Sequence, residues 1–173
     1  MSTTQVPVPS EVELTIVKQR FGLAEVQLGD AQLAASEKVA QLYNRKPRCE
    51  TRSVSLANTR KAFSLVICEY KPEAVSLNDA PIVRVVTYFL DEILIRLDVD
   101  AEGDATSFAS VESSLETDWP DARQRPLNAT DRVETVWLSG ADELSLSHLE
   151  AASMIEYRIR DTRLADKLPW LFE

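Results

Sequence analysis

The chain has 173 residues and a formal net charge of −9, with 45% hydrophobic and 27% charged residues. This length suits one domain with its own core, and we expect a single α+β domain over residues 1–173. The acidic balance disfavours phosphate backbones and anionic lipid surfaces, so nucleic acid and membrane are excluded as general partners. Within the domain we expect an N-terminal arm with a short helix (1–30), a core (31–160) and an apolar tail (161–173).

The N-terminus and the cysteines bear on the cellular compartment. Residues 1–9 have neither the basic nor the apolar segment of a secretory signal, and every apolar run is far shorter than the roughly 20 residues of a membrane helix. We therefore expect a cytoplasmic protein with reduced thiols. Cys68 lies in an apolar run and is expected in the core, whereas Cys49 is expected to be more accessible.

The first part of the chain favours two helices. Ser10 and Glu13 form a capping-box pattern, and apolar residues follow at helical spacing, which predicts a helix over residues 11–20. Strong helix formers dominate residues 31–43 and predict a second helix there. Pro47 prevents the second helix from continuing.

The middle of the chain is dense in β-branched and aromatic residues, which is typical of a half-buried sheet. The polar residues 71–81, with two prolines, predict a loop. Asp91 and Glu92 form either a tight turn or the middle of one bent strand, because Asp-Glu is not a hairpin signal. Around these connections, strands are predicted over residues 50–56, 61–70, 82–90, 93–99 and 107–111.

The last third of the chain has a mixed pattern. A polar connection is predicted over 112–126. Helices are predicted between Asn128 and Gly140 and over 145–153, and alternation over 154–160 predicts a strand. The apolar residues 168–172 are expected either to fold back over the sheet or to dock on another subunit. Together the elements predict a curved antiparallel sheet of four to five strands packed against helices.

Several short segments occur in an order known from one family. They are residues 54–56 followed by 61–62, then 81–84, 96–99, 110–111 and 126–127. Over residues 50–140 the chain thereby resembles the small N-terminal cystatin-like domains of copper amine oxidases, without their catalytic domain. The resemblance implies a cone-shaped antiparallel sheet on helices and no oxidase activity, because the single His148 cannot build a three-histidine copper site.

Four side chains are candidates for acid–base chemistry. Tyr70, Tyr88 and Asp91 lie on strands expected to line the concave side of the sheet, where phenols and carboxylates can transfer protons without a metal. His148, on a predicted helix, is a candidate general base. The alternative is that the tyrosines pack in the core, Asp91 lies in an exposed turn and His148 is structural.

No metal or cofactor is expected. Residues 98–104 begin like a calcium loop, with acidic residues at alternate positions and Gly103 for the sharp turn. Ala109 stands where the loop needs a bidentate glutamate, so we interpret this stretch as an acidic turn.

Three functional hypotheses follow from the predicted cup. The first is a cofactor-free binding module that holds a small apolar ligand or a protein partner, with Phe89, Trp137 and Trp170 as ligand-binding side chains. The second is a small metal-free isomerase, cyclase or lyase that uses the acid–base candidates. The third is a structural dimerisation domain, consistent with a homodimer. A filled interior favours an interaction module, and converging polar groups in an enclosed pocket favour an enzyme.

Overall fold

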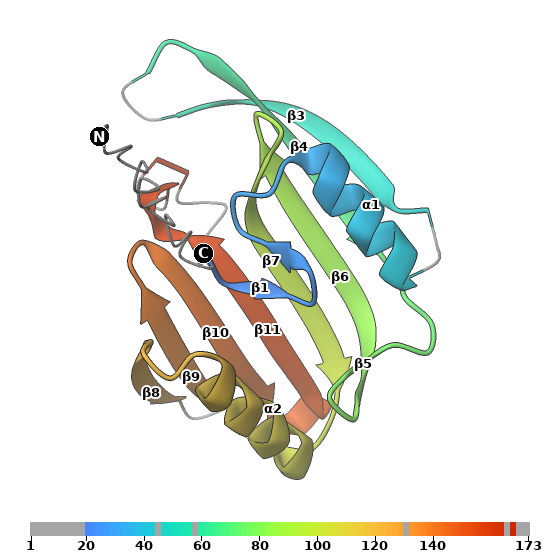
Figure 1. The fold of residues 1–173 in the computed structure, drawn as a ribbon, viewed down its shortest axis with the longest axis vertical. Helices are drawn as coiled ribbons and strands as arrows, with labels where there is room; N and C mark the ends of the chain where they lie inside the picture. Colours follow the sequence, from blue (N-terminus) through green and yellow to red (C-terminus); the bar gives the residue numbers. More distant parts are fainter. Residues whose placement is uncertain (1–19, 44–45, 57–58, 130–131, 165–166, 169–173) are drawn as a thin grey trace, which may run out of the picture.

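The computed structural model describes residues 20–43, 46–56, 59–129, 132–164 and 167–168. Within these residues, a nine-stranded antiparallel sheet and two α-helices form an α+β fold (Figure 1). The predicted class is therefore confirmed, and the predicted number of four to five strands is wrong. The helix predicted over residues 11–20 lies outside the described residues, apart from its last position.

The strands of the main sheet follow a simple order. Hydrogen-bonded neighbours run β3–β4–β6–β7–β11–β10–β9–β8, and each pair is antiparallel. A short β5 (Ser76–Leu77) pairs with β6, and β1 (Gly22–Leu23) and β2 (Val26–Gln27) form a separate hairpin. The long strands are β3 (Arg48–Ser55), β4 (Ala62–Tyr70), β6 (Ala80–Leu90), β7 (Ile93–Glu102), β8 (Arg123–Ala129), β9 (Arg132–Ser139), β10 (Asp142–Leu149) and β11 (Met154–Asp161).

The sheet consists of two successive units with the same order of elements. The N-terminal half (32–102) begins with α1 (Gln32–Tyr43) and contributes β3, β4, β6 and β7 to the sheet order. The C-terminal half (105–161) begins with α2 (Ala105–Asp118) and contributes β8, β9, β10 and β11. The last strands of the two halves, β7 and β11, pair at the centre of the sheet. The order of strands is therefore the same from either edge inward, although no repeat is visible in the sequence.

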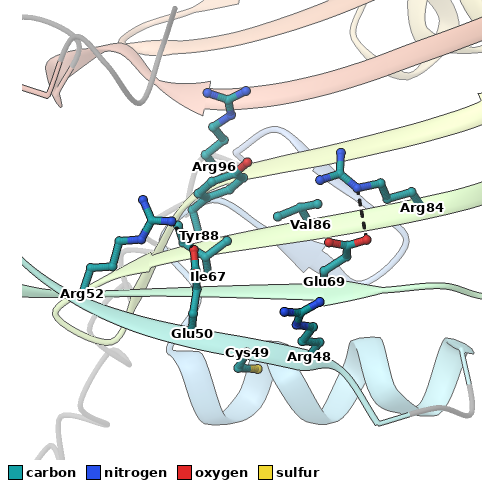
Figure 2. Close-up of a pocket in the computed structure, with 10 residues that line it drawn as sticks. All are labelled: Arg48, Cys49, Glu50, Arg52, Ile67, Glu69, Arg84, Val86, Tyr88 and Arg96. Atoms are coloured by element: carbon teal, nitrogen blue, oxygen red, sulfur yellow. Dashed lines mark hydrogen bonds and ion pairs between the residues drawn. The ribbon is translucent and has the colours of Figure 1, made fainter.

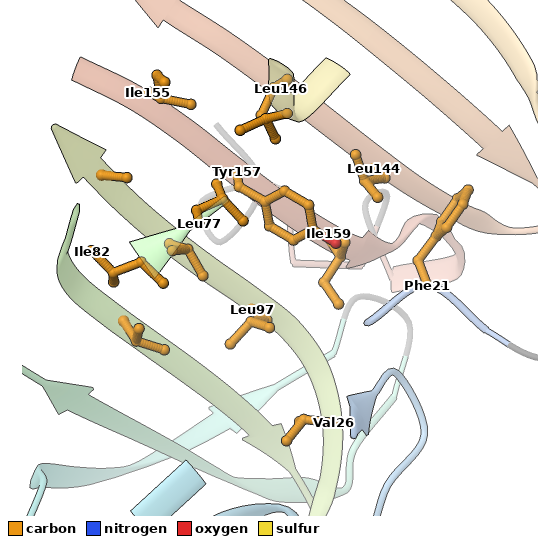
Figure 3. Close-up of a cluster of buried hydrophobic side chains, with 14 of the residues drawn as sticks. Phe21, Val26, Leu77, Ile82, Leu97, Leu144, Leu146, Ile155, Tyr157 and Ile159 are labelled. Carbon is orange, nitrogen blue, oxygen red and sulfur yellow. The ribbon is translucent and has the colours of Figure 1, made fainter. Parts of the chain in front are cut away.

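Both helices and the β1–β2 hairpin lie on one side of the sheet, called here the covered face (Figure 1). Alternate residues of the central strands point into the core beneath them, as Figure 3 shows for Leu97, Leu144 and Ile159. Tyr157 is also buried there, and its hydroxyl donates to the Gly22 carbonyl oxygen at 2.5 Å. No α-helix among the described residues packs on the opposite side, called the open face.

Helix α2 replaces the strand that was predicted over residues 107–111. The Asp104 carboxylate accepts hydrogen bonds from the backbone N–H groups of Thr106 and Ser107, which caps the helix. Phe108, Val111 and Leu115 then follow at helical spacing and are buried against the sheet. The cap and the helical period outweigh the strand preference of the local residues.

Strands β9 and β10 replace the two helices predicted between Asn128 and Gly140 and over 145–153. Val133 and Trp137 are four residues apart, which fits one face of a helix, but an even spacing also fits one face of a strand. Thr135 and Trp137 are buried on the covered face, and Val136 between them points the other way, into the row of Arg125 and Ser145. By contrast, the predictions of helix 31–43 and of the strands at 50–56, 61–70, 82–90, 93–99 and 154–160 are confirmed.

Asp91 and Glu92 form a two-residue turn between β6 and β7. Both have positive φ, 45° and 67°, as the two central residues of a type I′ hairpin turn require. The Asp91 carboxylate accepts a hydrogen bond from the Ser64 backbone N–H at 2.9 Å, which ties the turn to β4. Of the two predicted alternatives, the tight turn is therefore correct.

Cys49 and Cys68 form a disulfide, so the prediction of two reduced thiols is wrong. The antiparallel register of β3 and β4 places the two residues directly opposite each other, with their Cα atoms 4.1 Å apart. Nothing in the local sequence around either cysteine shows this register. The disulfide fastens the edge strand β3 to β4.

Candidate functional site

The open face carries rows of mainly charged side chains that cross all eight long strands. Because directly paired residues of antiparallel strands share a face, the register fixes which side chains lie together. One row crosses all eight long strands, from Arg48 in β3 to Arg125 in β8: Arg48, Glu69, Val86, Asp98, Arg158, Ser145, Val136 and Arg125. The adjacent row is Glu50, Ile67, Tyr88, Arg96, Arg160, Glu143, Leu138 and Arg123.

A pocket of about 470 Å³ lies on the N-terminal part of this face, and we call it the arginine pocket (Figure 2). Its floor is made by Ile67, Val86 and Tyr88 in the middle strands. Charged side chains from four neighbouring strands surround that floor, namely Arg48, Glu50, Arg52, Glu69, Arg84 and Arg96. Its lining is therefore mainly ionic.

Ion pairs hold most of these side chains in place. Arg84 lies between two carboxylates, 3.4 Å from Glu69 and 3.4 Å from Asp100. Arg52 and Glu50 form a pair at 2.6 Å, and both side chains are more than half exposed. Arg48 is exposed and has no ion pair with a described residue, which leaves its guanidinium available to a ligand.

Tyr88 and Arg96 form the central unit of the face. Arg96 donates to both carboxylate oxygens of Asp98 at 2.8 Å, and its guanidinium lies 5.0 Å from the centre of the Tyr88 ring. The Tyr88 hydroxyl donates to Asp98 at 3.3 Å. Burial and then the charge of Asp98 raise the pKa of Tyr88, so the phenol remains a neutral hydrogen-bond donor at neutral pH.

Like charges meet where the two halves join. Arg96 in β7 is paired directly with Arg160 in β11, an arrangement that destabilises a sheet unless each charge is compensated. Glu143 accepts from Arg160 at 2.9 and 2.8 Å, as Asp98 does from Arg96. A smaller hollow of about 190 Å³ opens over this seam.

Two polar atoms of the seam remain without a hydrogen bond to any described residue. They are one carboxylate oxygen of Asp100 and the Nε of Arg158, and both are buried. An unsatisfied buried polar atom costs about 1–3 kcal/mol, so such atoms mark places where a ligand or water is expected to bind.

Near the β6–β7 turn, the open face of β4, β6 and β7 is apolar and already covered. Leu56, Leu65, Leu90 and Ile95 form a cluster there, and Leu168 packs into it with none of its surface exposed. The first part of the C-terminal tail thus folds back onto the sheet, which was one of the two predicted alternatives. The remaining residues of the tail lie outside the described chain.

The four predicted acid–base residues are not gathered in one pocket. Tyr88 lies in the arginine pocket on the open face, whereas Tyr70 is buried in the core of the covered face. Asp91 lies in the exposed hairpin turn, with Lys61 4.0 Å away. His148 is on strand β10, not on a helix, and packs on the covered face with its ring centre 5.8 Å from that of Phe108.

The predicted ligand-binding aromatic residues have different positions. Phe89 and Trp137 are fully buried in the core of the covered face, and they line neither of the two open-face hollows nor the hollow beside α2. Trp170 lies outside the described residues. The arginines of the open face were not among the predicted site residues. A signal was available in the Arg-x-Arg pairs at 123/125 and 158/160, because residues two apart share a face of a strand.

A second hollow of about 790 Å³ lies on the covered side, between the β1–β2 hairpin and α2. Leu23, Leu115 and Trp119 contribute apolar walls. Two of its polar side chains already have partners: the Asn78 amide donates to Ser114 Oγ at 2.9 Å, and the Tyr157 hydroxyl donates to the backbone of the hairpin. This hollow therefore offers fewer unsatisfied groups to a ligand than the open face.

The described residues contain no group of three or more His, Cys, Asp or Glu side chains that could hold a metal ion. The carboxylates of the acidic stretch 98–104 have other partners, since Asp98 and Asp100 pair with arginines and Asp104 caps α2.

Among the described helices, none is long and apolar enough to cross a membrane. Comparisons with protein-family models, with curated proteins and with solved structures find no match for this chain.

Proposed function

We propose that this protein is a cofactor-free binding module that docks an acidic segment of a partner protein on its open face. The observation that carries the proposal is the concentration of arginines on the open face of a chain that is acidic as a whole. The whole chain has 19 basic and 28 acidic residues, yet nine arginines and eight carboxylates of the described strands lie on the open face. The arginines are Arg48, Arg52, Arg84, Arg96, Arg123, Arg125, Arg132, Arg158 and Arg160.

The type of basic residue supports a carboxylate-bearing partner. The guanidinium group binds carboxylates through two parallel hydrogen bonds, and it loses less hydration than an ammonium group does. All the basic residues in these paired rows are arginines, although the chain also contains lysines. A partner that carries Asp or Glu side chains is the ligand that such a surface recognises best.

Three observations favour this partner over the other hypotheses. The core of the covered face is filled by packed side chains, which favours an interaction module over a carrier of a small apolar ligand. The arginine pocket is lined mainly by charges. The separate placement of Tyr70, Tyr88, Asp91 and His148 gives the isomerase, cyclase or lyase hypothesis no support.

We also propose that the cystatin-like resemblance extends to the fold. The order of a helix followed by antiparallel strands in each half supports this, because the resemblance implies an antiparallel sheet packed on helices. The module would then present the free side of its sheet to the partner.

Binding of a fluorescent glutamate-rich peptide, compared with a lysine-rich peptide of equal length, tests the proposed function. We expect the acidic peptide to bind better despite the net charge of −9, and its affinity to fall as salt is added. Arg48→Glu should weaken binding by about tenfold, because it places a repulsive charge at the rim of the arginine pocket.

Lys38→Glu is the matched control, since it makes the same change of charge on α1, on the covered side. The proposal fails if the two variants weaken binding equally, because net charge would then explain the effect. A preference for the lysine-rich peptide would contradict it as well.

A further inference from the structure

The two edges of the main sheet are protected differently. Strand β8 carries Pro126 near its middle, and proline has no N–H to offer to an added strand. Strand β3 has no proline, glycine or lysine, and all of its residues except Val54 are exposed. No described residue pairs with its outer edge, which is therefore a regular eight-residue strand open to pairing within the described part of the chain.

The register of β3 with β4 shows which backbone groups point outward. A Cα–Cα distance of 4.1 Å between Cys49 and Cys68 is that of a pair without mutual backbone hydrogen bonds. The N–H and C=O of Cys49 therefore point away from β4, and by alternation those of Thr51 and Ser53 do so too. These three residues offer a row of donors and acceptors at the free edge.

We infer that this edge pairs antiparallel with β3 of a second copy of the chain, with Thr51 opposite Thr51 on the two-fold axis. Thr51 then exchanges two backbone hydrogen bonds with its counterpart, and Cys49 lies opposite Ser53 in the same way. On the open face, Glu50 of each copy lies opposite Arg52 of the other. The charge pattern of β3 is thus complementary to itself.

Neighbouring registers fit less well. An axis at Glu50 or at Arg52 places like charges opposite each other and uses backbone groups that already bond to β4. With the axis at Ser53, Arg52 faces Val54 and the ionic pairs are lost. An axis at Cys49 pairs Arg48 with Glu50 but brings Lys46 opposite Arg52. Only the axis at Thr51 pairs both central charges over most of the strand.

The pairing has a structural consequence that does not rest on the proposed function. The main sheets of the two copies become one continuous sheet, and both open faces lie on the same side of it. The arginine pocket is at the β3 side of its own sheet, so the two pockets become neighbours across the axis.

Charge reversal at two positions tests the inference, with sedimentation equilibrium of the full chain as the measurement. The unaltered chain should form dimers. Glu50→Arg and Arg52→Glu should each weaken the dimer by about tenfold, since each variant turns two attractive cross-strand pairs into repulsive ones. The Glu50 and Arg52 side chains are 54% and 53% exposed, so both variants should keep the fold, as circular dichroism will show.

Mixing the two variants gives the sharper result. An equimolar mixture should form heterodimers, because every reversed charge then faces an opposite one, and the double variant E50R/R52E should again dimerise alone. Thr51→Pro removes an outward N–H and should abolish the dimer, whereas Thr51→Val keeps that N–H and should not. A monomer at all concentrations, or a dimer that persists equally in both single variants, would overturn the inference.

Discussion

The two halves of the molecule have the same order of elements but hold their sheets in different ways. In the C-terminal half, α2 buries the large side chains Phe108, Val111 and Leu115 over the sheet. In the N-terminal half, the buried residues of α1 include only the smaller Ala35 and Val39 among those described. Packing of a helix on the sheet therefore contributes more to the stability of the C-terminal half than to that of the N-terminal half.

The N-terminal half has other stabilising contacts where the C-terminal half relies on helix packing. The Cys49–Cys68 disulfide joins its edge strand to the next strand, and a backbone bridge pairs Ala31, just before α1, with Ile93 at the start of β7. The arginine pocket, the larger of the two open-face hollows described above, lies on the open face of this half. The comparison suggests that the disulfide between β3 and β4 allows this half to carry a charged binding surface with less support from its helix.

Truncation of one buried side chain under each helix tests the difference in packing. Phe108→Ala should lower the free energy of unfolding by about 3–5 kcal/mol, because it leaves a cavity between α2 and the sheet. Val39→Ala removes a smaller buried group under α1 and should cost about 2 kcal/mol. Urea denaturation of both variants measures the two losses. Equal losses would mean that the two helices contribute alike.

Removal of the disulfide tests the alternative fastening of the N-terminal half. The double variant C49A/C68A should lose about 3 kcal/mol of stability, because the bond closes a short loop of the unfolded chain. Hydrogen exchange should accelerate most in β3 and least in β8, which has no such bond. Uniform acceleration over both edges would show that the disulfide stabilises the whole domain and not the edge alone.

The same contrast explains which parts of the fold the sequence predicts. In the N-terminal half, α1, β4 and β6 have patterns that only one kind of element satisfies, and their predictions are confirmed. In the C-terminal half, Phe108 and Val111 are strand formers locally, and the Asp104 cap that makes them helical was interpreted as part of an acidic turn. Trp137, four residues from Val133, fits a strand as well as a helix.

The candidate site was predictable in part only. Tyr88 was identified from its strand, and the structure places it at the centre of the open face. The arginines around it come from strands that are distant in the sequence, such as Arg48 and Arg158, and their proximity depends on strand order and register. Neither property can be worked out from local patterns. The disulfide was missed for the same reason.

The smallest predicted effect on the free energy of unfolding concerns two hairpin turns, one in each half. Glu92, in the turn between β6 and β7, has φ of 67°, a conformation that costs an ordinary residue about 1 kcal/mol relative to glycine. In the turn between β9 and β10, Gly140 has a similar φ of 62° and open space where a Cβ would lie. The first turn thus carries backbone strain that the second avoids.

Exchanging the residue types should therefore reverse the difference. Glu92→Gly should raise the free energy of unfolding by about 1 kcal/mol, and Gly140→Ala should lower it by about the same amount. Glu92→Ala is the control, since it removes the carboxylate but keeps the Cβ and should gain little. If Glu92→Ala stabilises the protein as much as Glu92→Gly does, the cause is the charge of Glu92 next to Asp91 and not the backbone. A gain confined to Glu92→Gly would establish that the β6–β7 hairpin forms because the long pairing of its strands outweighs an unfavourable turn.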